Sequence, residues 1–202
     1  MTQQDTARKL LEEYGRTYAQ EAGITLRDKP SPLYRLLVLT TLLSVRISAD
    51  LAVAAARELS RSGWRTPKAM LRATWQQRVD ALGRAHYKRY DESTASYLEQ
   101  GAQLVQDRYA GDLRRLRAEA DGDVAALRRL LTDVPRIGPT GAHIFCREVQ
   151  VVWPEVRPYF DERALDEATK RGLPGDARRL GRLVDGDDVG TLAAALVRAS
   201  LT

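Results

Sequence analysis

Apolar residues recur at helical spacing along almost the whole of this chain, and no segment shows the alternation of a half-buried strand. This pattern predicts helices joined by short turns, and therefore an all-α protein. The run over residues 33–45 is too long for a typical strand and too apolar for a surface helix, so we expect a buried helix there. Counting this one, the expected helices cover residues 6–22, 33–45, 49–61, 67–73, 75–82, 87–116, 123–131, 139–149, 161–171, 176–183 and 191–201. Thr66 and Thr74 are the expected N-caps of the fourth and fifth of these helices, and Gly83 is expected to end the fifth.

Composition limits the kinds of site that this chain can build. Its one cysteine, Cys146, excludes an intrachain disulfide and a cysteine-built zinc or iron–sulfur site, because such sites need several thiolates. The two histidines, His86 and His143, are too few for a histidine-rich metal centre. No run reaches the roughly 18 apolar residues of a membrane span, and the polar start lacks an apolar signal core. We therefore expect a cytoplasmic protein without membrane contact, nucleoid-associated if it is bacterial.

The charge balance favours polyanions only if the basic side chains cluster. The chain carries 32 basic and 27 acidic side chains, a net charge of +5. Nearly all of the basic residues are arginines, which either reflects a GC-rich genome or serves phosphate binding by guanidinium groups.

The most informative segment is residues 130–145, in which two amphipathic helices flank a short turn. Pro139 suits the first position of the second helix, because proline lacks an amide hydrogen that would need a partner there. The amides of Thr140 and Gly141 then face outward at the positive end of the helix, an arrangement that binds phosphate. The alternative is an ordinary helical hairpin in which Gly138 and Pro139 only turn the chain.

Four segments resemble, in family order, the motifs of the helix–hairpin–helix superfamily of DNA glycosylases of the endonuclease III type. They are residues 42–46 (LLSVR), 82–88 (LGRAHYK), 131–142 (LTDVPRIGPTGA) and 153–161 (WPEVRPYFD). The resemblance extends over residues 31–172. It implies an all-α, two-lobed helical DNA glycosylase fold that carries a helix–hairpin–helix motif. Residues 31–150 would form the central lobe, ending in the hairpin, and residues 1–30 with 151–202 the second lobe.

The resemblance also implies an activity, namely base excision from double-stranded DNA by a monomeric enzyme. The target nucleotide would be flipped out of the stack, and Asp161 would be the catalytic carboxylate. A carboxylate suits this reaction, because the sugar gains oxocarbenium character as the base leaves. From the residues alone, Asp161 is equally a helix N-cap for the segment that starts at Glu162.

The remaining candidate residues also follow from the resemblance. Those expected at the DNA are Arg46, Arg136, Ile137, Gly138, Thr140 and Gly141, with Arg46 at the position that fills the space of the flipped base. A surface arginine at a helix break is the alternative for Arg46. Residues expected near the base pocket are His86, Tyr87 and Tyr90, although tyrosines at such positions more often pack at the edge of a core.

This chain departs from the family pattern in ways that restrict its chemistry. Thr140 occupies the position of the hairpin lysine, and a hydroxyl cannot form an imine, so we expect no β-lyase activity. Arg136 replaces the first hairpin glycine. No iron–sulfur cluster and no other cofactor is expected, while a monovalent cation at the hairpin turn is compatible with the resemblance. We therefore expect a monofunctional DNA glycosylase; the alternatives are a catalytically inactive helix–hairpin–helix DNA-binding protein and a helical interaction protein.

Overall fold

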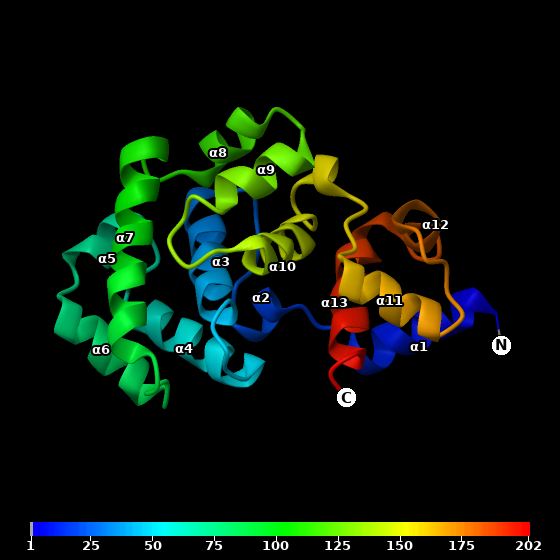
Figure 1. Ribbon diagram of the computed structural model, residues 1–202, viewed down its shortest axis with the longest axis horizontal. Coiled ribbons are helices and arrows are strands. Elements are labelled where there is room, and N and C mark those ends of the chain that lie inside the picture. The colour runs from blue at the N-terminus through cyan, green and yellow to red at the C-terminus, as the bar shows by residue number, and fades with distance from the viewer. Residues whose placement is uncertain (1) are drawn as a thin grey trace. The chain divides into compact units, whose positions relative to one another are not determined.

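The computed structural model describes residues 2–202, which form helices joined by turns without any strand (Figure 1). This confirms the all-α class. The chain divides into two compact units. One comprises residues 22–145, and the other combines the segment that ends at Glu21 with residues 146–202. From the sequence we had expected the divisions after residues 30 and 150.

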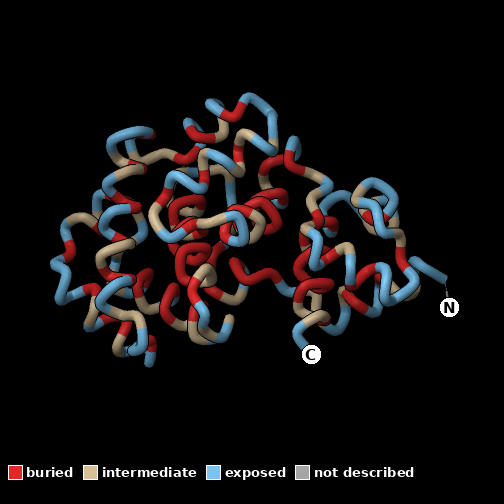
Figure 2. The backbone as a smooth tube through the Cα atoms, viewed as in Figure 1, coloured by how far each residue is buried: buried red, intermediate tan, exposed pale blue. Residues whose placement is uncertain are grey.

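A buried helix, α3 (Pro30–Leu43), forms the centre of the unit of residues 22–145. It contacts α4 (Ala49–Arg61), α7 (Asp91–Tyr109) and α8 (Leu113–Ala120). Figure 2 shows α3 as buried along most of its length, as the apolar run predicted. Its buried residues are Leu33, Tyr34, Leu36, Leu37, Val38, Leu39, Thr40, Thr41 and Leu42. Since burying one leucine contributes about 1.5–3 kcal/mol, the buried leucines of α3 contribute strongly to the stability of this unit.

Capping residues define the other helices of this unit. Thr66 caps α5 (Pro67–Arg72), where proline takes the first helical position, and Thr74 forms a capping box at α6 (Trp75–Arg84). Both caps agree with the sequence expectation. The unit also contains α9 (Val124–Leu131) and the first part of α10 (Pro139–Val149), the two helices of the predicted hairpin.

Two long helices expected from the sequence are interrupted. The expected helix over residues 87–116 starts only at Asp91 and breaks after Tyr109, because Ala110 and Gly111 both adopt a left-handed conformation. Asp112 then caps α8. Likewise, the helix expected over residues 6–22 is two helices, one that ends at Tyr14 with Gly15 as its C-cap and a short one over Tyr18–Glu21. The helical spacing of the side chains continues through residues 15–17, although the backbone there is not helical.

A second buried helix, α13 (Val189–Ala199), organises the other unit. It packs against α1 (Gln3–Tyr14) and α11 (Glu162–Lys170) (Figure 1). Side chains of all three helices join one apolar cluster, which includes Ala7, Leu10, Ala164, Ala168, Leu192 and Leu196. The shorter elements of this unit are α2 (Tyr18–Glu21), η1 (Pro154–Val156), α12 (Ala177–Gly181) and η2 (Gly186–Asp188).

Among residues 2–202, no helix has the length and apolar character needed to cross a membrane. Nor does this part of the chain bring three or more His, Cys, Asp or Glu side chains into a group that could hold a metal ion.

Candidate functional site

The turn between α9 and α10 holds Arg136 in a conformation that normally belongs to glycine. The amide of Ile137 donates to the carbonyl of Val134 over 3.0 Å, which closes a four-residue turn. Pro135 occupies its second position and Arg136 its third, with φ at +74°. These features are those of a type II turn, whose third position favours glycine. The turn therefore places an arginine in a backbone conformation that favours glycine.

The start of α10 offers backbone donors to a ligand. Gly138 precedes the helix, and its carbonyl accepts from the amide of Ala142 over 2.9 Å. Because glycine has no side chain, it cannot cap the amides of Thr140 and Gly141. The first turn of α10 contains no acidic residue, so the positive end of the helix is not compensated locally.

Gly141 is required by packing as well as by access to a ligand. A Cβ atom at this position would lie 2.5 Å from Ser44 Oγ and 3.0 Å from Ile137 Cγ2. Ser44 is the C-cap of α3, and its hydroxyl donates to the carbonyl of Thr40 over 2.7 Å. The hairpin therefore packs directly on the end of the buried helix, and with Ser44 at that end a residue without a side chain fits best at position 141.

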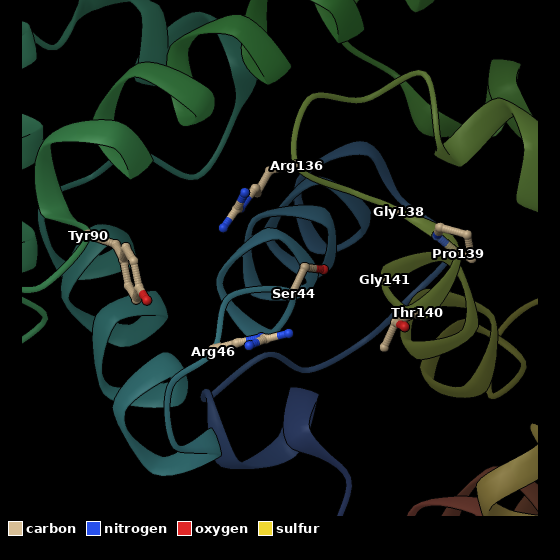
Figure 3. Close-up of a pocket in the computed structure, with 8 residues that line it drawn as sticks. All are labelled: Ser44, Arg46, Tyr90, Arg136, Gly138, Pro139, Thr140 and Gly141. Carbon is tan, nitrogen blue, oxygen red and sulfur yellow. The ribbon is translucent and has the colours of Figure 1, made fainter.

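A polar pocket of about 320 Å³ opens at this junction. Figure 3 shows the side chains of Arg46 and Arg136 extending into the space between Tyr90 and the start of α10. Two guanidinium groups thus face one pocket whose lining contains no carboxylate, so the pocket favours an anion. Its lining consists of Ser44, Arg46, Tyr90, Arg136, Gly138, Pro139, Thr140 and Gly141.

Arg136 is braced by an aromatic ring from another helix. Its guanidinium carbon lies 5.6 Å from the centre of the Tyr97 ring, within the range of a cation–π contact. Tyr97 belongs to α7, and it therefore orients the cation at the pocket. The sequence offered no signal for this pairing.

Of the residues expected at the DNA and the base pocket, three do not line this pocket, each for a local reason. Ile137 is buried at 2% exposure and packs the hairpin against the core. His86 is exposed and adopts a left-handed conformation, with φ at +62°, where the chain leaves α6. Tyr87 is buried, and its hydroxyl shares a 2.9 Å hydrogen bond with Thr94 Oγ1. Burial raises the pKa of Tyr87, which keeps its hydroxyl neutral.

The candidate catalytic carboxylate, in the other unit, is held on both of its oxygens. Asp161 caps α11, and its Oδ1 accepts from the amide of Ala164 over 3.0 Å. Its Oδ2 accepts from Arg147 Nη1 over 2.6 Å. The side chains of Arg147 and Asp161 are 3% and 11% exposed. Capping, the alternative that the sequence left open, is therefore confirmed, and it coexists with a buried ion pair that the sequence did not indicate.

The segment leading to Asp161 is fixed by Gln150. Its side-chain amide donates to the carbonyls of Arg147 and Tyr159, and its oxygen accepts from the amide of Tyr159. These distances lie between 2.8 and 3.0 Å. One buried side chain thus joins the end of α10 to the residues just before Asp161. A signal for it existed in the sequence, namely the polar residues at 147, 148 and 150 beside the apolar residues 144–146, 149, 151 and 152.

Glu148 is a further buried charge on α10. Its carboxylate accepts from the amides of Tyr18 and Ala19 over 3.3 and 2.9 Å and so caps α2. Burial raises the pKa of Glu148, while Arg147 and the two amides act in the opposite direction.

Comparison with solved structures shows which fold this is. The chain is similar to a trapped endonuclease III–DNA covalent intermediate, solved as an estranged-adenine complex, with 14% sequence identity and a TM-score of 0.56. The alignment covers 98% of this chain and 85% of that one. No protein family matches the sequence, and no curated protein does so either. The likeness shows that the chain has the all-α fold of endonuclease III.

Proposed function

We propose that this protein binds double-stranded DNA and excises a damaged or mismatched base as a monofunctional DNA glycosylase. The observation that carries the proposal is the convergence of the hairpin start, Arg46 and Arg136 on one pocket without a carboxylate. Helix amides and paired guanidinium groups are the usual donors to a DNA phosphate. The shared fold supports the same assignment, since the similar structure is a complex with DNA.

In the proposed reaction, Asp161 stabilises the cationic sugar by its negative charge. The bond between C1′ and the base nitrogen breaks, and the base leaves with the bonding electrons. Water adds to C1′, and the proton that it loses neutralises the nitrogen of the departed base, which leaves an abasic site and a free base. Each oxygen of Asp161 has one protein donor and therefore keeps further acceptor capacity. Thr140 cannot form an imine, so the strand remains intact.

The catalytic part of the proposal is tested by base release from duplexes that contain uracil, alkylated, oxidised or mismatched bases, followed by heat and alkali. We expect release from at least one duplex, and we expect Asp161→Asn to abolish it while DNA affinity is retained. Borohydride should trap no covalent adduct. Full activity of Asp161→Asn would exclude this mechanism, and a trapped adduct would show that a lysine acts as nucleophile.

A second candidate function is DNA binding without catalysis. It is favoured by the partners of Asp161, because an ion pair with Arg147 and a bond to the Ala164 amide are also what a purely structural N-cap would make. An active wild-type protein excludes this candidate. If no duplex in the panel loses a base while binding remains strongly dependent on salt, the non-catalytic function is correct.

A further inference from the structure

We infer that Arg147 is a positioning residue for the Asp161 carboxylate, which it holds as a fixed anion facing the sugar; this inference rests on the proposed glycosylase activity. It starts from the 2.6 Å bond between Arg147 Nη1 and Asp161 Oδ2. The other oxygen is bound by the amide of Ala164, so the carboxylate has two anchors on different elements. A carboxylate held in this way cannot rotate to follow a substrate.

A contribution to folding stability does not explain why an arginine is buried at position 147. Removing a guanidinium from water is costly, and replacing a buried ion pair by apolar side chains is often neutral or stabilising. Moreover, Arg147 Nε is buried and finds no hydrogen-bond partner in the part of the chain that the structure describes. An unsatisfied buried donor adds to the cost. Arg147 therefore leaves its Nε unpaired while its Nη1 binds Asp161.

The surroundings of Arg147 keep it aimed at Asp161. Gln150 binds the backbone carbonyl of Arg147 on one side and both backbone groups of Tyr159 on the other. This bridge sets the distance between the end of α10 and the approach to Asp161. Glu148, the next residue, interacts electrostatically with Arg147 but directs its oxygens to the amides of Tyr18 and Ala19. Asp161 is therefore the carboxylate to which Arg147 donates a hydrogen bond.

This arrangement assigns a definite role to Asp161. The Asp161 carboxylate accepts one hydrogen bond from Arg147 and one from the amide of Ala164, and these two bonds hold it in a single orientation. It therefore acts as a fixed negative charge against the developing oxocarbenium ion, and not as the group that deprotonates water. A misplacement of about 1 Å in such a group lowers a rate by roughly 10²-fold.

The experiment compares single-turnover base release by the wild type, Arg147→Lys, Arg147→Gln and Arg147→Ala, with duplex affinity measured in parallel. Arg171→Gln is the matched control, because Arg171 is the C-cap of α11 and pairs with Glu167, while Asp161 caps the other end of that helix. We expect Arg147→Gln to reduce the rate by about 10²-fold with unchanged duplex affinity. Arg147→Lys should recover part of the rate, because it restores the charge but not the geometry.

Chemical rescue separates positioning from general structural damage. Added methylguanidinium should restore base release by Arg147→Ala, whereas sodium chloride at equal ionic strength should not. Wild-type rates in both Arg147→Gln and Arg147→Lys would overturn the inference while leaving the proposed function intact. A wild type that releases no base would instead overturn the proposed function, and this inference with it. If Arg147→Gln and Arg147→Ala do not fold, Arg147→Lys decides alone. A full rate of base release by this variant refutes the positioning role, and a reduced rate at unchanged duplex affinity supports it.

Discussion

Replacing Arg136 by glycine and by alanine separates what this residue does for the backbone from what its side chain does. Arg136 has φ at +74°, and a left-handed conformation costs a residue with a Cβ atom about 1–2 kcal/mol. Glycine removes that cost but stabilises the unfolded chain by about 0.4–1 kcal/mol through its greater freedom. Both variants lose the contact with Tyr97, which contributes about 0.5–1 kcal/mol at an exposed site.

These magnitudes predict that Arg136→Gly unfolds with nearly the wild-type free energy and is about 0.5–1 kcal/mol more stable than Arg136→Ala. Urea unfolding of the three proteins measures this difference. DNA affinity should follow a different order, because neither variant has a guanidinium at the pocket. Both should bind duplex DNA equally weakly, with a salt slope reduced by about 0.9 for the lost phosphate contact.

Two results would refute this reasoning. Equal stability of the glycine and alanine variants would mean that the turn does not strain its third residue. A clearly higher DNA affinity of Arg136→Gly than of Arg136→Ala would mean that close backbone approach, and not the guanidinium, binds the phosphate.

Three further predictions concern packing and charge. Gly141→Ala should destabilise the protein by about 1–3 kcal/mol in thermal unfolding, since its Cβ would overlap Ser44 Oγ; adding Ser44→Ala should recover part of the loss, and no recovery would exclude this contact as the cause. Arg78→Met should cost roughly 3 kcal/mol, because the buried guanidinium donates to the carbonyls of Met70, Ala73 and Ala95; an unchanged urea midpoint would contradict it. Burial raises the pKa of Glu148 above 4.5, so its contribution to stability is full below that pH and declines as pH rises through the raised value. The stability of Glu148→Gln relative to the wild type should therefore increase with pH, and a flat difference across about pH 5–8 would show that this group is not responsible.

Helices could be predicted from the sequence where the local spacing of apolar residues matches the face that the structure buries. The apolar run of residues 33–45 identified the buried helix α3, and Thr66 and Thr74 marked true helix starts. The prediction failed where a non-glycine residue adopted a left-handed conformation. Gly83, expected to end a helix, lies inside α6, and His86 makes the left-handed turn instead. The spacing of apolar residues does not reveal a helix end of this kind, because apolar residues continue on both sides of the left-handed residue.

The candidate site could be predicted only in part, for a related reason. The hairpin is a continuous segment, so its turn, its helix start and the special position of Arg136 can be read from neighbouring residues. Arg46 and Tyr90 reach the same pocket from distant parts of the chain. The pairing of Arg147 with Asp161 likewise depends on how the connector between them folds. No spacing rule encodes such contacts, which tertiary packing alone creates.

The close packing of Gly141 against Ser44 at the end of α3 should restrict which residues homologous proteins carry at these two positions. A side chain at position 141 and a hydroxyl at position 44 compete for the same volume. We therefore expect the two positions to covary among homologous chains: wherever alanine or serine occupies the first, the second should shrink to glycine or alanine.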